Sequence, residues 1–241
     1  MSEHDDAARI AARAGELLLA LRESSDLTGS ALKDEADRQA HDCIMQLLAE
    51  AYPDDPVLSE EGRDDTARLS SSRAWIVDPL DGTREYSEGR SDWAVHVALA
   101  VNGVASIGAV ALPGLGTVLA TDPAPTLSAP HEGPPRMVVS RTRPPEITET
   151  LRAAIGAELV PMGSAGAKAM AVVRGEADVY AHAGGQYEWD SAAPVAVAAA
   201  AGLHVSRMDG SALRYNTAEV WLPDLLVCRK EFADAVLEAA R

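Results

Sequence analysis

The stretch WIVDPLDGT, residues 75–83, is the most informative segment of the sequence. Its first three residues are apolar and predict a short buried strand. Pro79 and Gly82 then force a turn, and Thr83 is a suitable N-cap for a helix that follows directly. Such a turn would aim two aspartate carboxylates and the Leu80 carbonyl at one point.

Oxygen-only ligands of this kind suit a hard cation such as Mg²⁺. The amides of Gly82 and Thr83 would face the same point from a helix N-terminus, where an anion is stabilised. The structural alternative is a capped turn with Asx hydrogen bonds. An EF-hand is excluded because position twelve from Asp78 is Gly89 and not Glu. The haloacid-dehalogenase loop D-x-D-G-T is excluded because two residues separate the aspartates here.

Two further acidic segments lie on either side of this stretch. Glu60 and Glu61 follow the apolar pair Val57-Leu58 at an expected strand end, and Asp190 precedes an Ala-rich helix expected over 191–201. Taken singly, Glu60 is typical of a surface acid and Asp190 of an acid favoured by a helix dipole. The three segments together indicate a metal site.

The remaining pattern predicts a mixed α/β or α+β protein. A hairpin is expected where the apolar run 93–101 meets Asn102-Gly103, the dipeptide best suited to a type I′ turn. The Pro-rich segment 121–135 is the best internal boundary, giving an N-terminal part over 1–125 and a C-terminal part over 136–241. Other expected elements are helices over 6–25, 31–51, 148–155, 164–173 and 232–240, and strands over 137–139, 178–181 and 225–228.

Composition limits the function. The 241 residues carry 37 acidic and 21 basic side chains, a net charge of −16, which argues against nucleic acid polymers and anionic membranes as partners. A small anionic substrate is not excluded. Hydrophobic residues make up 47%, enough for a core, but only 4% are aromatic, so Ala, Val and Leu must build it.

The N-terminus and the cysteines predict a cytoplasmic location. The chain begins with acidic residues where a secretory signal would have basic and apolar ones. The longest weakly polar stretch, 93–120, is interrupted by Asn-Gly and Pro-Gly and so predicts strands and not a membrane span. Cys43 and Cys228 show no zinc-like spacing and are expected to be free thiols.

The ordered combination SEE, DPLDGT and WD resembles the inositol monophosphatase superfamily of Mg²⁺-dependent, lithium-sensitive phosphatases, over about residues 10–228. DPLDGTREY is similar to the DPLDGTKEF of the 3′(2′),5′-bisphosphate nucleotidase branch, the CysQ type, with actinobacterial members most similar. Residues 138–141 (VVSR) and 213–216 (LRYN) resemble that branch's VSRSH and DGxPLxYN segments. The resemblance implies a layered αβαβα sandwich with the metals between its two parts.

The resemblance also implies a ligand set for two Mg²⁺ ions and allows a third near Glu60. Glu60, Asp78 and the Leu80 carbonyl would hold the first ion, while Asp78, Asp81 and Asp190 would hold the second. The charges balance, because four carboxylates face two divalent ions. The catalytic residues implied are Glu60 together with a proton-accepting pair in which the Thr83 hydroxyl is hydrogen-bonded to Asp37.

The substrate side follows from the same resemblance, which implies contacts from Gly82, Thr83, Ser140, Arg141, Gly163, Ser164, Lys168 and Asp190. Arg141 and Lys168 are cationic candidates for a 5′-phosphate, although Lys168 would also fit an exposed helix position. The segment 182–187 is expected to be a loop lining the base pocket. Two positions depart from the family pattern: Asp34 stands in place of a Thr, and Arg143 in place of the His of VSRSH.

The implied reaction is removal of the 3′-phosphate from 3′-phosphoadenosine 5′-phosphate to give AMP, with the phosphosulfate analogue as a second substrate and a link to sulfate assimilation. An inositol-1-phosphate or fructose-1,6-bisphosphate phosphatase is the alternative within catalysis. A non-catalytic Mg²⁺ and nucleotide sensor is the alternative of another class. Family members are often homodimers, and the expected partner is otherwise a small phosphate substrate only.

Overall fold

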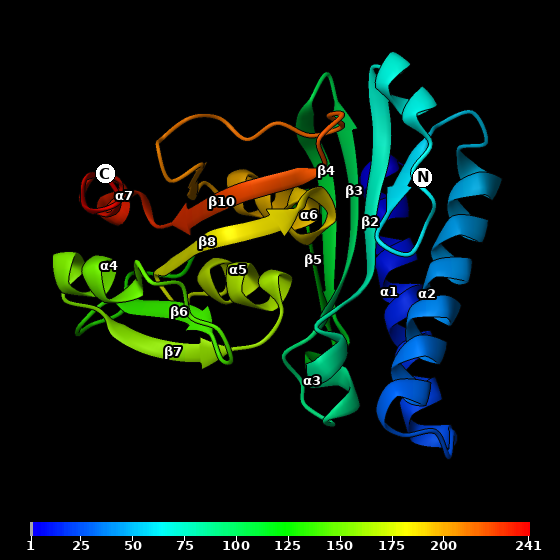
Figure 1. The fold of residues 1–241 in the computed structure, drawn as a ribbon, viewed down its shortest axis with the longest axis horizontal. Helices are drawn as coiled ribbons and strands as arrows, with labels where there is room; N and C mark the ends of the chain where they lie inside the picture. The colour runs from blue at the N-terminus through cyan, green and yellow to red at the C-terminus, as the bar shows by residue number, and fades with distance from the viewer. Residues whose placement is uncertain (1) are drawn as a thin grey trace.

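The computed structural model describes residues 2–241 and has five layers of helices and sheets (Figure 1). The helices are α1 (Glu3–Ser24), α2 (Gly29–Ala51), α3 (Thr83–Ser87), α4 (Thr148–Ile155), α5 (Ala165–Val173), α6 (Glu188–Ala200) and α7 (Lys230–Ala239). The strands are β1 (Val57–Ser59), β2 (Arg73–Asp81), β3 (Ala94–Val101), β4 (Val104–Leu112), β5 (Thr117–Ala120), β6 (Arg136–Ser140), β7 (Glu158–Met162), β8 (Val179–Tyr187), β9 (His204–Ser206) and β10 (Trp221–Cys228). Short 3₁₀ turns lie at Thr66–Ser70 and Pro113–Leu115.

Each half of the chain forms one five-stranded sheet. The first has the order β1-β2-β3-β4-β5, with β1 parallel to β2 and the other neighbours antiparallel. The second has the order β7-β6-β8-β10-β9 and is mixed. The loop that joins the sheets is the Pro-rich segment 121–135, the boundary that the sequence indicated. The division into parts 1–125 and 136–241 stays a prediction.

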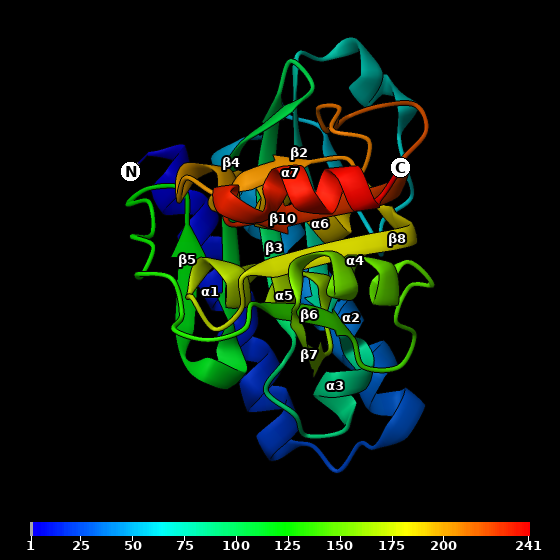
Figure 2. The ribbon, with the colours of Figure 1, turned by 90° about the vertical axis from the view of Figure 1, so that its left-hand side faces the viewer.

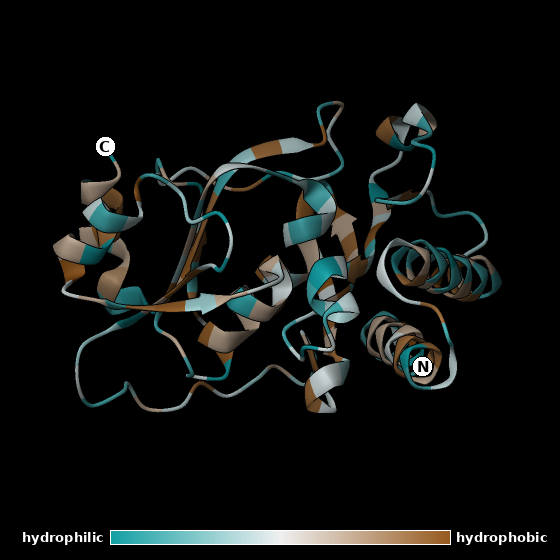
Figure 3. Cartoon of the chain, turned by 60° about the horizontal axis from the view of Figure 1, so that its bottom comes forward, coloured by the Kyte–Doolittle hydropathy of each residue, from teal (hydrophilic) through white to brown (hydrophobic). Residues whose placement is uncertain are grey.

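Three apolar clusters fill the spaces between the layers. One lies between α1, α2 and the first sheet, a second between the sheets around α5 and α6, and a third between the second sheet and α4, α7. Figure 2 shows α4 and α7 in front of the second sheet, and Figure 3 shows polar and apolar residues around α1 and α2, as amphipathic surface helices require. This arrangement is the predicted αβαβα sandwich.

Small side chains replace aromatic bulk in the central layer. A Cβ on Gly108 of β4 would lie 2.8 Å from the Ala193 carbonyl and 2.9 Å from the Ala196 methyl group, both on α6. The helix therefore packs almost directly against the strand backbone. The core is built largely of Ala, Val and Leu, as the composition predicted.

Local structure agrees with the sequence at the hairpin and differs from it in two places. Asn102 (φ 51°) and Gly103 (φ 77°) form the expected turn with both residues at positive φ. The predicted cap at Thr83 was wrong: Gly82 (φ 91°) is the N-cap and Thr83 is the first helical residue. The predicted loop 182–187 was also wrong, because β8 continues through it. Among residues 2–241, no helix has the length and hydropathy needed to cross a membrane.

Candidate active site

Asp78 and Asp81 lie together where β2 becomes irregular. The pairing of β2 with β3 shifts register between these residues, so the two side chains do not follow simple alternation. Asp78 is 1% exposed and Asp81 is 8% exposed. The Leu80 amide donates to Asp78 Oδ1 at 3.0 Å, which is the Asx hydrogen bond of the structural alternative. The turn thus satisfies its own backbone while still presenting both carboxylates at one place.

Asp81 is held by the start of α5. Its Oδ2 accepts hydrogen bonds from Ser164 Oγ (2.5 Å) and from the Gly166 amide (2.6 Å). Burial opposes ionisation, but contacts with His96, Ser164 and Gly166 outweigh it and lower the pKa of Asp81 to about 2. Ser164, predicted to bind substrate, therefore also orients a carboxylate.

His96 belongs to this site and was missed by the sequence reasoning. It is fully buried on β3, with Nε2 3.3 Å from Asp81 Oδ2 and Nδ1 3.0 Å from the Trp189 carbonyl. Asp78, Asp81 and His96 each offer an atom within 4.8 Å of the others. A Cβ on Gly166 would come within 2.0 Å of His96 Nε2, so α5 covers that nitrogen. The one signal in the sequence was a single polar residue inside an apolar strand.

Glu60 and Asp190 complete what we call the carboxylate cluster: Glu60, Asp78, Asp81 and Asp190. Glu60 follows β1, and its amide donates to the Val77 carbonyl at 3.3 Å, which keeps it beside β2. Asp190 lies in the first turn of α6, where its Oδ2 accepts from the Tyr187 amide at 2.6 Å. These acids come from three separate segments of the chain.

The carboxylate cluster carries more negative charge than its surroundings neutralise. Crowding by protein atoms and the charge of Asp190 raise the pKa of Glu60 to about 7, although its side chain still reaches solvent. Burial and the charge of Asp81 raise the pKa of Asp190 to about 6. Burial and the charge of Glu60 raise the pKa of Asp78. A set of hard oxygen donors with excess negative charge fits divalent cations such as Mg²⁺.

The predicted proton-accepting pair lies on neighbouring helices. Asp37 is a half-buried residue of α2, which packs against α3, the helix that begins at Thr83. Thr83 Oγ1 donates to the Leu80 carbonyl at 3.2 Å, and no Thr83–Asp37 hydrogen bond occurs in the described part of the chain. Burial, with the charges of Glu61 and Asp34, raises the pKa of Asp37 to about 7.

The predicted substrate residues lie where strands β6 and β7 end and helix α5 begins. Ser140 ends β6 and is in register with Met162, directly before Gly163 and Ser164. Lys168 is not the exposed helix residue of the alternative interpretation. It is 6% exposed and its Nζ donates to the Ser164 carbonyl at 2.6 Å.

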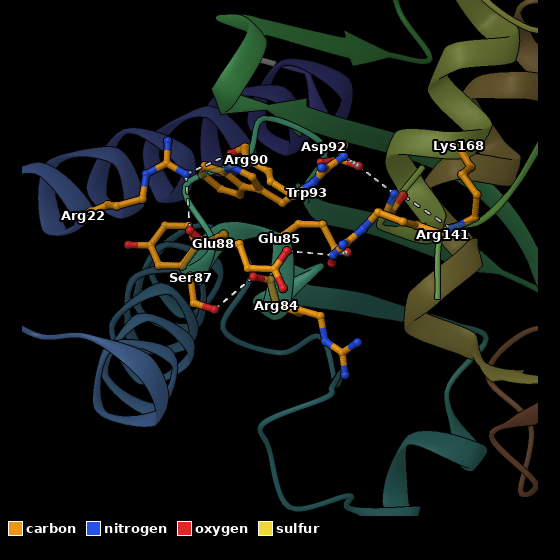
Figure 4. A network of polar contacts seen from close by, with 12 residues as sticks. Arg22, Arg84, Glu85, Ser87, Glu88, Arg90, Asp92, Trp93, Arg141 and Lys168 are labelled. Carbon is orange, nitrogen blue, oxygen red and sulfur yellow. Dashed lines mark hydrogen bonds and ion pairs between the residues drawn. The ribbon is translucent and has the colours of Figure 1, made fainter. Parts of the chain in front are cut away.

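Arg141 is paired with acids of α3 and the residue after it. Its NH2 group lies 2.8 Å from Glu85 Oε1 and 2.8 Å from Glu88 Oε2, and Figure 4 shows its guanidinium directed at this helix. Nearby, Arg90 pairs with Asp92, whose other contact is the Gly163 amide at 2.7 Å. We call these residues the arginine network: Glu85, Glu88, Arg90, Asp92 and Arg141.

A cavity of about 670 Å³ opens beside Ser140. One wall is the segment that follows β6, and the other is β8. Its lining residues are Ser140, Arg143, Pro144, Pro145, Glu146, Ile147, His182, Ala183, Gly184 and Gly185.

The model of the inositol monophosphatase family matches residues 2–241. The chain belongs to the inositol monophosphatase family. This confirms the resemblance carried by SEE, DPLDGT and WD.

Two relatives with named activities are similar in sequence to this chain over most of its length. The chain is 50% identical over 236 residues to a protein of Mycobacterium bovis named 3′-phosphoadenosine 5′-phosphate phosphatase, covering 94% of this chain and 88% of that one. It is 34% identical to the 3′(2′),5′-bisphosphate nucleotidase CysQ of Escherichia coli K12, covering 78% and 80%. Both names agree with the predicted branch.

Solved structures of the family confirm the fold. CysQ from Bacteroides thetaiotaomicron superposes with a TM-score of 0.80 at 29% identity, covering 94% of this chain and 97% of that one. An inositol monophosphatase from Thermotoga maritima superposes with a TM-score of 0.80 at 21% identity, covering 100% and 97%. The family is metal-dependent, and the acidic cluster here is suited to a metal.

Proposed function

We propose that the protein is a Mg²⁺-dependent phosphomonoesterase that removes the 3′-phosphate of 3′-phosphoadenosine 5′-phosphate to give AMP. The observation that carries this proposal is the 50% identity, over 94% of the chain, to a mycobacterial protein named for that activity. The carboxylate cluster supports it, because a site for a phosphate dianion needs cations to offset four acids. We extend the proposal to the 5′-phosphosulfate analogue and to a role in sulfate assimilation.

We propose that two Mg²⁺ ions are held by oxygen atoms of Glu60, Asp78, the Leu80 carbonyl, Asp81 and Asp190, and that a third ion binds near Glu60. When bound, these ions supply Lewis-acid activation of water and offset the charge of the phosphate. The protein supplies the oxygen donors in a fixed arrangement. Ser164 and Gly166 orient Asp81 through hydrogen bonds, and Tyr187 orients Asp190.

Asp37 and Thr83 are the residues that we propose to move the proton of the attacking water. A general base works best when its pKa is close to the pH of the medium, and that of Asp37 is raised to about 7. Threonine alone is a poor base, so its hydroxyl can only relay a proton to a carboxylate. In this proposal Thr83 turns from Leu80 toward Asp37 when substrate binds. Glu60 is a third residue that we propose to take part in this step.

Backbone groups and side chains from both sheets would position the phosphate ester. The amides of Gly82 and Thr83 begin α3 and offer donors to phosphate oxygens. Ser140, Gly163, Ser164, Lys168 and Arg141 lie on the side of the second sheet. Ser164 acts there through its hydrogen bond to Asp81, and Lys168 through its hydrogen bond to the Ser164 carbonyl. Asp190 contributes from the first turn of α6.

The test is phosphate release from three substrates in Mg²⁺, with and without Li⁺. The proposal expects the highest kcat/KM with 3′-phosphoadenosine 5′-phosphate, inhibition by Li⁺, and loss of activity in EDTA. A higher kcat/KM with inositol 1-phosphate or fructose 1,6-bisphosphate would refute the branch assignment. Absence of release from all three, with Mg²⁺ and nucleotide binding retained, would favour the sensor.

The same proposal covers the kind of substrate, the location and the oligomeric state of the protein. The acidic chain would act on a small phosphate substrate and not on a nucleic acid polymer, in the cytoplasm, as a homodimer. Sedimentation equilibrium tests the last point, because a homodimer has about twice the monomer mass of 25.3 kDa. A monomer across the micromolar range would exclude it.

A further inference from the structure

The segment 211–220, between β9 and β10, has no regular secondary structure, yet two of its side chains are buried. Leu213 is 9% exposed and Tyr215 is 2% exposed, and both belong to the apolar cluster between the sheets. They are part of the LRYN sequence, residues 213–216, which includes none of the proposed ligands or substrate contacts. Figure 1 shows this segment, in orange, crossing from the second sheet to β4 of the first. The segment therefore joins the two halves of the chain.

Hydrogen bonds from Tyr215 and Asn216 fix this segment to the first half of the chain. The Asn216 side chain accepts from Arg68 Nη1 at 3.0 Å and donates to the Arg68 carbonyl at 3.1 Å. The Tyr215 amide donates to the Gly103 carbonyl at 3.1 Å, in the turn between β3 and β4. Arg68 is 1% exposed, and its guanidinium donates twice to the Asp64 carboxylate, at 2.7 and 3.0 Å. The partner that Asn216 binds is therefore itself held in place.

The same segment holds the start of α6 through Glu188, the first residue of that helix. Glu188 is fully buried, and a buried carboxylate is costly unless hydrogen bonds satisfy it. Its Oε2 accepts from the Asn216 amide at 2.6 Å. Its Oε1 accepts from the Thr217 amide and from the Thr217 hydroxyl, both at 2.9 Å. Residues 216 and 217 thus supply three donors to the end of this helix.

Asp190 lies between two points at which α6 is held by this segment. Glu188 precedes it by two residues, and Ser191 follows it directly. The Ser191 hydroxyl lies 3.2 Å from the Tyr215 hydroxyl, and both residues are buried. The other three acids of the carboxylate cluster belong to the first half of the chain, to which the same segment is bound. Residues 213–217, which we call the linking segment, therefore connect Asp190 to the half of the chain that carries the other acids.

We propose that the linking segment sets the position of Asp190 relative to the other three acids, and that Asn216 is its central positioning residue. The inference rests on the proposed function, because it takes the carboxylate cluster as the Mg²⁺ site. Asn216 joins both halves within one residue, since its side chain binds Arg68 and its backbone amide binds Glu188. Carboxylates that are already in place lose less conformational freedom when an ion binds, so they bind it more tightly.

Asn216→Gly tests this role. Asn216 has φ 55°, which glycine adopts without strain, so the change removes the side-chain bonds to Arg68 and keeps the amide that binds Glu188. The apparent dissociation constant for Mg²⁺ is obtained from the rise of Tm with Mg²⁺ concentration, with the metal alone. It should increase about 10-fold in the variant. The Mg²⁺ concentration that gives half-maximal kcat/KM should increase equally, while kcat at saturating Mg²⁺ stays within about 2-fold of that of the unaltered protein.

Asn102→Gly is the matched control. Asn102 is the only other asparagine in the chain, also has positive φ (51°), and is exposed in the turn between β3 and β4. This change should leave the dissociation constant for Mg²⁺ unaltered. Tyr215→Phe removes only the hydroxyl beside Ser191, and should raise the dissociation constant about 3-fold.

The outcomes separate positioning from a purely structural role. A lower Tm in EDTA with an unchanged Mg²⁺ dissociation constant, in both Asn216→Gly and Tyr215→Phe, would overturn the inference and leave the proposed function intact. If the unaltered protein binds Mg²⁺ but releases no phosphate, the proposed function alone is refuted, because the Tm measurement still tests the linking segment. If Mg²⁺ does not raise the Tm of the unaltered protein, the proposed metal ligands and the inference are both refuted.

Discussion

Two acid-rich regions lie beside each other in this protein, and they differ in how their charge is balanced. In the arginine network each carboxylate has a guanidinium or amide within about 3 Å. In the carboxylate cluster Asp81 accepts two hydrogen bonds, from Ser164 and Gly166, while burial and the charges of neighbouring acids raise the pKa values of Glu60, Asp78 and Asp190. A region whose carboxylates are paired within the chain stabilises the fold. A region whose negative charge is not balanced within the chain indicates a cation that must bind from solution.

The sharpest test of this contrast makes the same change in each region. Asp81→Asn should lower kcat/KM on the order of 10³-fold, about 4 kcal/mol, because a proposed metal ligand loses its charge. Asp92→Asn, in the arginine network, should lower it less than about 10-fold. Steady-state kinetics measures both, and circular dichroism verifies that both variants fold. Full activity in Asp81→Asn would contradict the metal assignment.

Arg141→Gln tests whether the arginine network is structural. Glu85 is 7% exposed and would lose its partner, so the free energy of unfolding should fall by about 1–2 kcal/mol. Urea denaturation measures this change. Activity toward 3′-phosphoadenosine 5′-phosphate and toward 3′-AMP should fall equally, if at all. A loss confined to the bisphosphate would show that Arg141 binds the second phosphate.

The carboxylate cluster also predicts an unusual dependence of stability on pH. The folded-state pKa values of Glu60 (about 7) and Asp190 (about 6) lie above their ordinary values of 4.5 and 3.8. The folded protein therefore binds more protons than the unfolded chain between about pH 5 and pH 7, so its stability rises as the pH falls through this window. Glu60 is partly exposed, so we expect a modest rise in Tm of about 2–4 °C from pH 7.5 to 6 in EDTA.

Saturating Mg²⁺ should reverse that trend, because metal binding requires deprotonated ligands and stabilises only the folded state. Calorimetry at several pH values, with EDTA or with Mg²⁺, measures both curves. Asp190→Asn should flatten the EDTA curve. A curve in EDTA that falls with decreasing pH from the start would show that the acids are balanced without a metal.

The sequence predicted those features that depend on local chemistry or on an ordered motif. Asn102 and Gly103 both tolerate positive φ, so this dipeptide specifies its turn locally. The acids at 60, 78, 81 and 190 stand in the motifs SEE, DPLDGT and WD, which identify the family. The sequence could not show that Arg141 is neutralised, because Glu85 and Glu88 lie more than fifty residues away. It also did not reveal β8 beyond residue 181, because Gly184 and Gly185 resemble loop residues although their neighbours pair with β10.

His96 is the clearest example of information that only the fold supplies. One histidine in an apolar run has no ligand spacing, so its sequence position is typical of a satisfied core residue. Its meaning comes from three neighbours on different elements: Asp81, Trp189 and Gly166. Sequence reasoning finds residues that act in a motif, and it misses those that act through distant contacts.

The close contact between α6 and Gly108 has a mechanical consequence. This helix carries Asp190 and lies between the two sheets. It packs tightly against β4, because Ala193 and Ala196 contact the strand backbone at Gly108. Any displacement of Asp190 toward Asp78 and Asp81 would be transmitted by α6 to β4 and to β8, β9 and β10 of the second sheet, which the helix contacts. Cation binding should therefore restrict the motion of the two sheets relative to each other. Proteolysis in the segment 121–135, which joins them, should slow when Mg²⁺ is added.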